Sequence, residues 1–306
     1  MPQFWRIYDS KIIPAAVTPK LGFSYPDNVW NIPDEYLDNK VFTIMRTCHS
    51  LGDWGIISAM PRLLKTKYPD CKVIVPSTKL LTNIFGQFSA NWKQWANPFE
   101  NAELIFKNNP YVDEFADYID GEIFHDHYRI YDVTNEEIPL IVQMLSFWGF
   151  EDLNWQDYLP ELYFTKEEMD LGDFIIKTII GEGEYGSLLL TNTTKDYYDD
   201  KVNRLLLDRI QEYKDLPFIY YGSKDIRDTE FSFLKLAGDI KHMPDMPLRV
   251  QLYIKTKAKV NIGYHSGIND SICRYTKVIA TPMHPNNVES LRENYLDKIE
   301  YLRYEV

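Results

Sequence analysis

Short apolar runs alternate along this chain with stretches in which apolar residues recur at helical spacing. Residues 41–47 form the first apolar run and predict a buried strand. After a turn at 50–53, helical spacing predicts a helix over 56–68, kinked at Pro61. Residues 72–75 return as a strand. This unit implies two parallel strands joined by a right-handed crossover.

The same alternation continues along the chain. In the first half it predicts strands at 103–106 and 129–133 and a helix at 135–148. In the second half, helices are predicted at 171–180, 201–213, 248–256 and 267–275. Strands are predicted there at 187–191, 217–221, 259–262 and 278–280. Alternating strands and helices in two halves predict an α/β fold with two doubly wound, Rossmann-like domains.

The expected domain limits follow the breaks in this pattern. Residues 1–40 carry prolines and aromatics without a clear period, so we expect an extended arm. Residues 41–162 are predicted to form the first Rossmann-like domain and residues 163–285 the second. The last segment, residues 286–306, is expected to contain a helical stretch that packs back on the first domain.

Composition and charge exclude several classes of protein. The 306 residues are 45% hydrophobic, enough for two ordinary domains. No run approaches the roughly 18–20 apolar residues that span a bilayer, and the N-terminus has no secretion signal. We therefore expect a cytoplasmic protein with at most peripheral membrane contact. The net charge of −12 argues against nucleic acid as a partner, because binding phosphates needs a basic face.

Neither cysteines nor histidines indicate a metal site. Cys48, Cys71 and Cys273 are far apart in the chain and form no Cys-x-x-Cys pair. His125 and His127 would share one face of a strand, but no further ligands cluster with them. We expect reduced thiols and no bound metal.

Candidate chemistry follows three predicted strands, where ligands bind in open α/β sheets. The first candidate is the turn Ser50-Leu51-Gly52-Asp53. Gly52 allows a tight turn. A carboxylate at a helix start ordinarily caps free N–H groups, an effect of about 1 kcal/mol. The functional alternative makes Asp53 a general base, worth roughly 10²–10⁴-fold in rate.

The other two candidates are suited to anions. Thr193, Thr194 and Lys195 follow the strand at 187–191, and hydroxyls with a lysine can bind phosphate oxygens; the alternative is a polar turn. The turn at Ser266-Gly267 opens a helix, whose N–H groups favour an anion; the alternative is an ordinary strand-to-helix turn. The glycine patterns of dinucleotide-binding and P-loop sites are absent from the sequence.

At these motifs the chain resembles the bacterial heptosyltransferases, the ADP-heptose:lipopolysaccharide glycosyltransferases of family nine. The strand, Leu-Gly-Asp turn and helix over 44–75 are similar to that family's opening. Residues 109–114, Asn-Pro-Tyr-Val-Asp-Glu, are similar to its hP-x-V-D-E segment. The run from Met246 to Gly267 matches without a gap the spacing from its donor-contacting methionine to its D-[ST]-G turn. The resemblance covers about residues 41–285.

The resemblance implies a GT-B fold, two Rossmann-like domains facing a central cleft, and an inverting reaction without metal or cofactor. It implies that the first domain holds the acceptor, beside Ser50 and Gly52, with Asp53 as catalytic base. It implies that the second domain binds a nucleotide-diphosphate sugar. The donor-binding residues that it implies are Thr193, Thr194, Lys195, Gly222, Asp225, Met246, His265, Ser266, Gly267, Ile268 and Asp270.

The chain departs from the family at several of these positions. The family's Asp before Ser/Thr-Gly is His265 here, and its downstream His is Asp270. The exchange preserves a charge pair or marks a changed donor. Tyr198 stands where the family has a lysine, for which Lys195 is a substitute. The arm 1–40 has no counterpart, and the acidic charge fits poorly with an anionic lipopolysaccharide acceptor.

Three functions are compatible with these features. The first is an inverting glycosyltransferase that moves a sugar from a nucleotide-diphosphate sugar to a glycan or glycolipid hydroxyl. The second is a non-catalytic GT-B-like binding or assembly protein, suggested by the exchanged His265 and Asp270. The third is another enzyme that modifies nucleotide-sugars, such as an epimerase.

Overall fold

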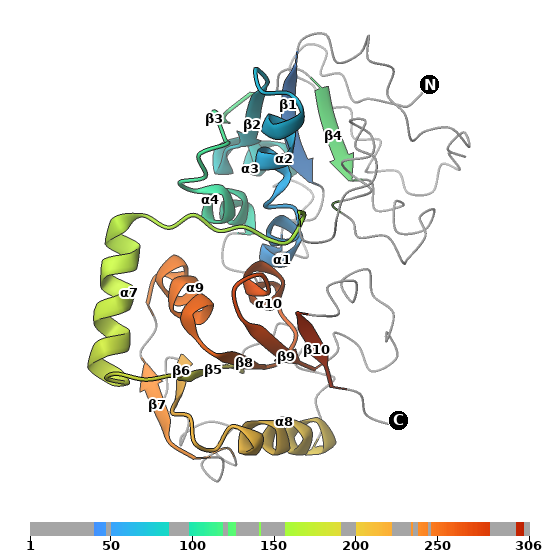
Figure 1. The fold of residues 1–306 in the computed structure, drawn as a ribbon. Coiled ribbons are helices and arrows are strands. Elements are labelled where there is room, and N and C mark those ends of the chain that lie inside the picture. The colour runs from blue at the N-terminus through green and yellow to red at the C-terminus, as the bar shows by residue number, and fades with distance from the viewer. Residues whose placement is uncertain are drawn as a thin grey trace. The chain divides into compact units, whose positions relative to one another are not determined.

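The computed structural model describes residues 40–46, 50–85, 98–118, 122–126, 141, 157–190, 200–221, 234, 238–243, 246–281 and 298–302. The chain divides into two compact units, residues 1–163 and 164–306 (Figure 1). Both described sheets are wholly parallel and are joined to helices. The predicted α/β class with parallel sheets is therefore confirmed.

The sheet of the first unit has the strand order β3-β2-β1-β4. Its strands are β1 (Val41–Arg46), β2 (Lys72–Pro76), β3 (Glu114–Ala116) and β4 (Glu122–Asp126). The helices of this unit are α1 (Leu51–Gly55), α2 (Met60–Lys67), α3 (Thr78–Phe85), the 3₁₀ turn η4 (Pro98–Glu100) and α4 (Asn101–Phe106).

Two sequence predictions in this unit are wrong. Residues 103–106 belong to helix α4, not to a strand. Ala102, Ile105 and Phe106 are its buried residues, a helical spacing that four residues alone cannot distinguish from a buried strand. Pro61 does not kink a continuous helix. A turn at 56–59 separates α1 from α2, and Pro61 lies in the first turn of α2, where a missing N–H costs nothing.

The sheet of the second unit has the order β10-β9-β8-β5-β6-β7. Its strands are β5 (Gly186–Leu189), β6 (Phe218–Tyr221), β7 (Ile240–Met243), β8 (Val260–Gly263), β9 (Lys277–Ala280) and β10 (Ile299–Tyr301). Numbered from β5, this is the 3-2-1-4-5-6 order of a Rossmann sheet. The order reverses between β5 and β8, which lie side by side with Leu189 opposite Gly263.

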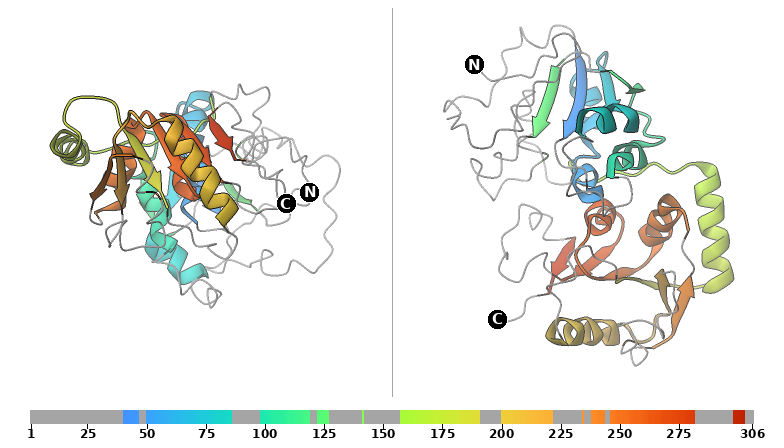
Figure 2. Two further views of the ribbon diagram at one scale, coloured as in Figure 1. Left: turned by 90° about the horizontal axis from the view of Figure 1, so that it is seen from below. Right: turned by 180° about the vertical axis from the view of Figure 1, so that it is seen from behind.

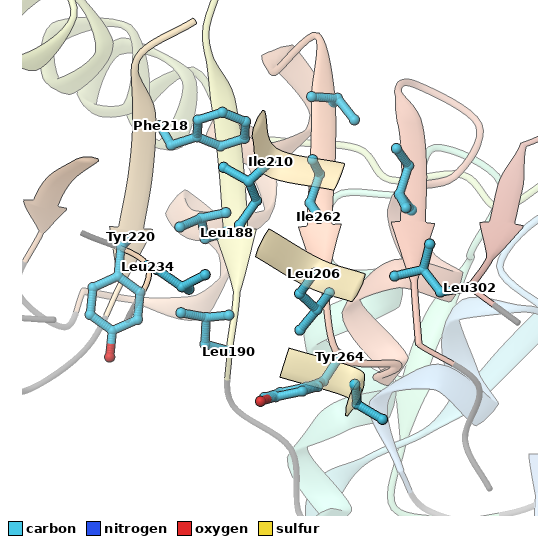
Figure 3. Packing of buried hydrophobic residues seen from close by; sticks show 13 residues of the cluster. Leu188, Leu190, Leu206, Ile210, Phe218, Tyr220, Leu234, Ile262, Tyr264 and Leu302 are labelled. Carbon is cyan, nitrogen blue, oxygen red and sulfur yellow. The ribbon is translucent and has the colours of Figure 1, made fainter. Parts of the chain in front are cut away.

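Helices cover both faces of this second sheet. Helix α8 (Asp200–Glu212) lies on one face and α9 (Leu248–Lys257) and α10 (Gly267–Ile272) on the other (Figures 1 and 2). On the α8 face, Leu206 and Ile210 pack with side chains of β5, β6 and β8 in one apolar cluster (Figure 3). Each large apolar side chain so buried contributes about 1.5–3 kcal/mol.

The opposite face is closed by α7 (Lys166–Ile179) together with α9. Thr165 begins α7 with a capping box, in which its hydroxyl and the Glu168 carboxylate bond each other's backbone N–H. Arg249 of α9 forms ion pairs with the same Glu168, with N–O distances of 2.8 and 3.0 Å. The start of α7 is thereby tied to α9.

Two strands of this sheet were not predicted. β7 has the sequence Ile-Lys-His-Met, which contains no continuous apolar run, and most of the strand is only partly buried. β10 pairs with β9, and the Leu302 N–H bonds the Ala280 carbonyl at 2.8 Å. Residues 299–301 of the segment 286–306 are therefore an edge strand of the second sheet. Three alternating residues, Ile-Glu-Tyr, are too few to predict a strand.

Gly263 allows the close approach of the two central strands. A Cβ atom added there would lie 1.9 Å from the Leu189 carbonyl oxygen, a backbone atom that no rotamer change can move.

We expect Gly263→Ala to lower the free energy of unfolding by about 2 kcal/mol or more, measured by urea denaturation. At Gly172 the added Cβ would meet the Tyr253 ring instead. Because that ring can rotate, Gly172→Ala should cost less; an equal loss would contradict this explanation.

Candidate functional site

Asp53 lies in the first turn of α1, just after strand β1. Its side chain is buried, with 2% of the residue exposed. Ser50 is the N-cap residue, and its hydroxyl donates to Asp53 Oδ2 instead of capping the helix. The Asp53 N–H bonds the Ser50 carbonyl at 3.1 Å. The structure thus brings together the predicted Ser50, Gly52 and Asp53, with the carboxylate held by a hydroxyl rather than acting as a simple cap.

The second unit has its own candidate site where β5 and β8 end. In a doubly wound sheet a ligand binds beyond the carboxyl ends of the strands, at the point where the strand order reverses. Here that point lies between β5 and β8. The Tyr264 N–H bonds the Leu189 carbonyl at 2.8 Å, so the two strand ends are joined up to the first residue after β8.

The turn that follows β8 contains the predicted anion-binding residues. Ser266, Gly267 and Ile268 are partly exposed, whereas His265 and Asp270 are buried. Ser266 is the N-cap of α10, and its hydroxyl accepts the Ile268 N–H at 3.2 Å. An anion at this turn would therefore compete with the Ser266 hydroxyl for that N–H group.

His265 and Asp270, the two exchanged residues, lie close together behind this turn. Nε2 of His265 is 3.8 Å from Oδ2 of Asp270, and the two side chains are 3% and 0% exposed. The His265 ring stacks on Tyr301 of β10 at a centroid distance of 5.7 Å. The backbone N–H of His265 donates a hydrogen bond of 3.2 Å to the Thr281 hydroxyl. His265 and Asp270 therefore form a buried imidazole–carboxylate pair.

Met246 precedes helix α9 and is held by a hydrogen bond to its backbone carbonyl and by the packing of its side chain. Its carbonyl accepts a bond of 2.7 Å from the Gln251 amide. Its side chain packs against the apolar cluster on the α7 and α9 face, which includes Tyr221. The remaining predicted donor-binding residues, Thr193, Thr194, Lys195, Gly222 and Asp225, lie outside the described residues.

Other sequence expectations are reported for the described parts of the chain only. Cys71 and Cys273 are buried free thiols, and burial raises the pKa of both. Cys48 and His127 lie outside the described residues, as do the strand at 129–133 and most of the helix at 135–148. No group of three metal-binding side chains occurs in the described segments. In those segments no helix has the length and apolar character to cross a bilayer.

Sequence reasoning missed Lys255, the most unusual charged residue of the second unit. It lies on α9, is 1% exposed, and donates from Nζ to the Ser187 hydroxyl at 2.7 Å and the Leu188 carbonyl at 3.1 Å. Burial lowers its pKa from 10.5 to about 7. The signal was present in the sequence, because Lys255 follows Leu248 and Leu252 on the apolar stripe of a helix.

Comparison with known proteins supports the fold. No protein-family profile and no curated protein sequence matches this chain. A family 9 glycosyl transferase from Veillonella parvula is similar, with a TM-score of 0.59, 8% identity and 87% of each chain covered. ADP-heptose LPS heptosyltransferase II from E. coli is similar, with a TM-score of 0.50, 13% identity, and 87% of this chain and 91% of that chain covered. The resemblance to these glycosyltransferases is therefore confirmed at the level of the fold.

Lys255 should make the stability of the second unit depend on pH. Its pKa is about 7 when folded and 10.5 for the free side chain, so the unfolded state binds more protons between these values. Stability then rises with pH across this window and is lowest below pH 7. We expect Lys255→Met to raise the free energy of unfolding at pH 7 by about 2 kcal/mol, measured by urea denaturation.

The gain from Lys255→Met should shrink toward pH 10, where the lysine is neutral in both states and keeps its two hydrogen bonds. Lys257→Met is the matched control, because Lys257 is an exposed lysine of the same helix. It should leave the pH dependence unchanged. A gain for Lys255→Met that does not vary with pH would contradict the assignment.

Proposed function

We propose that this protein is an inverting, metal-independent glycosyltransferase of GT-B architecture. It moves a sugar from a nucleotide-diphosphate sugar to a hydroxyl group of a glycan or glycolipid. The observation that carries the proposal is the Rossmann strand order of the second unit, with a polar turn at its switch point. The fold likeness to the V. parvula family 9 transferase and the E. coli heptosyltransferase supports the same class of reaction.

In this proposal the second unit holds the donor. The diphosphate lies against the turn at Ser266-Gly267-Ile268, where N–H groups and partly exposed backbone meet a negative charge. His265 lies behind the turn, with Nε2 3.8 Å from Oδ2 of Asp270. Met246 contacts the base, and Gly222 and Asp225 contact the nucleoside. Thr193, Thr194 and Lys195 contact the phosphates.

The first unit supplies the base. Asp53 takes the proton of the acceptor hydroxyl while the acceptor oxygen forms a bond to the anomeric carbon. The bond between that carbon and the diphosphate breaks, and a nucleoside diphosphate leaves with its electron pair. Ser50 keeps the carboxylate oriented through its hydroxyl. The charge of the leaving group is met by protein groups, so transfer is expected to persist in excess EDTA.

A non-catalytic nucleotide-sugar-binding protein is the second candidate. The observation that favours it is the burial of Asp53, which is 2% exposed and already bonded to Ser50. A base in that state must gain access to the acceptor before it can act. The two functions share the donor site. They differ in whether the bound donor is turned over, with Asp53 as the base.

Replacing the base tests catalysis separately from binding. We expect Asp53→Asn to lower turnover at least about a hundredfold while the donor Kd changes less than about threefold. Turnover is measured as release of nucleoside diphosphate from a bound nucleotide-sugar in the presence of a glycan acceptor library. Asp70→Asn, an exposed aspartate of the same strand–helix–strand unit, is the control. Full activity in Asp53→Asn would rule out Asp53 as the base.

The His265–Asp270 pair is tested by exchange. We expect His265→Gln and Asp270→Asn each to lower kcat/KM by about tenfold, and the double variant to lose little more, because either change breaks the same pair. The reciprocal variant His265→Asp with Asp270→His restores a pair in the order typical of the resembled family. It should recover activity above either single variant; independent, multiplying losses would show that the two residues do not act together.

A further inference from the structure

Lys255 is a lysine ammonium group inside the core of the second unit. Helix α9 carries it, and its side chain reaches the middle of the sheet. Nζ bonds the Ser187 hydroxyl and the Leu188 carbonyl of β5, at 2.7 and 3.1 Å. Nζ also lies 4.7 Å from the centroid of the Tyr221 ring, which is the last residue of β6.

No carboxylate of the described residues forms an ion pair with this ammonium group. The groups in contact with Nζ are neutral: Ser187 and the Leu188 carbonyl on β5, and the Tyr221 ring on β6. The backbone carbonyls of Lys255 and Ile254 accept hydrogen bonds from the side chains of Asn261 and Tyr185. Charged side chains on α7 and α9 have other partners. Arg249 of α9 is paired with Glu168, and Asp173 of α7 accepts from the Tyr253 hydroxyl.

The amine of Lys255 lies within the β5–β8 pairing, on the amino-terminal side of the switch point. Leu188, to which it bonds, is one residue before the end of β5, and Tyr221 ends β6. At about 3.3 Å per strand residue, the end of β5 at Leu189 lies about 3 Å beyond Leu188, and a turn four residues further on lies at most about 13 Å beyond it. Leu188 pairs with Ile262 of β8, and the anion-suited turn begins four residues later at Ser266. The ammonium group therefore lies beneath the edge where a diphosphate would bind.

We propose that Lys255 is an internal positioning cation for the diphosphate at the β5–β8 switch point, because its buried amine bonds β5 within that pairing. This inference rests on the proposed function, and it adds a residue that never touches the donor. It also gives a reason for a lysine on the apolar stripe of α9, where an apolar side chain would be more stable.

The strength of the coupling follows from distance and dielectric. At about 10 Å and an effective dielectric constant near 20, one negative charge raises the pKa of a buried amine by about one unit. A diphosphate diester carries two such charges. Since the pKa of Lys255 is about 7 without ligand, binding near neutral pH should draw a proton from solvent onto Nζ. Two charges therefore raise the pKa by about two units, and an uptake of about 0.7 proton per bound donor is expected at pH 7.5.

Calorimetry measures this proton directly. Wild-type protein is titrated with ADP-ribose, ADP-glucose, UDP-glucose and GDP-mannose, whose diphosphate diesters do not themselves titrate between pH 6 and 9. Each titration is repeated in HEPES and Tris, whose different ionisation enthalpies report the number of protons taken up. For any member that binds, we expect uptake of about 0.7 proton at pH 7.5 and an affinity that falls toward pH 9.

Variants assign the proton to Lys255. Lys255→Met should abolish the uptake, weaken binding about five- to twentyfold at pH 7.5 and remove the decline toward pH 9. Lys257→Met, which removes an exposed lysine of the same helix, should behave as wild type. Lys255→Leu provides a second apolar replacement, and circular dichroism verifies that each variant is folded.

The outcomes separate the two proposals. If a nucleotide-sugar binds wild type and Lys255→Met with the same affinity, uptake and pH profile, Lys255 has no part in the donor site while the proposed function stands. If no nucleotide-sugar in the panel binds wild type, the proposed function fails and the role of Lys255 fails with it. A folded Lys255→Met that loses the uptake but keeps full affinity would also overturn the positioning role.

Discussion

The contact between the backbones of β5 and β8 is the constraint on which the second unit depends. β5 begins the sheet and β8 begins its second half, so their pairing joins two sets of strands that the chain forms separately. The approach is close enough that Gly263 has no room for a Cβ atom against the Leu189 carbonyl. The same pairing defines the switch point. The polar turn and the His265–Asp270 pair follow β8, and Lys255 bonds the β5 strand of this pairing.

Three of the buried polar groups adjoin strands of the two sheets. Asp53 follows β1, the His265–Asp270 pair follows β8, and Lys255 bonds Ser187 and Leu188 within β5. Each costs stability relative to an apolar side chain, because a charge loses its hydration when buried. Elsewhere in the second unit the core is built from apolar clusters on both faces of the sheet.

The partners of these buried groups differ in kind. Asp53 is held by a neutral hydroxyl three residues away, so its environment is set by local sequence. The His265–Asp270 pair is also local, but its stacking partner Tyr301 comes from the last strand of the sheet. Lys255 depends on Ser187 and Tyr221, which lie on other strands. The surroundings of Lys255 therefore form only when β5, β6 and α9 are assembled.

The sequence by itself determined the α/β class, most helices and strands of the second unit, and the Ser50–Asp53 and His265–Asp270 groupings. These are short-range features, set by the period of apolar residues and by residues within one turn. Only the tertiary structure decided that 103–106 is a helix, that 299–301 joins the second sheet, and that Lys255 is buried beneath the switch point. The spacing of the buried residues of α4 and the place of Lys255 on an apolar stripe are local signals that a short window leaves ambiguous. The pairing of β10 with β9 and the bonds of Lys255 to β5 join residues far apart in the chain, so the local pattern of apolar and polar residues carries no record of them.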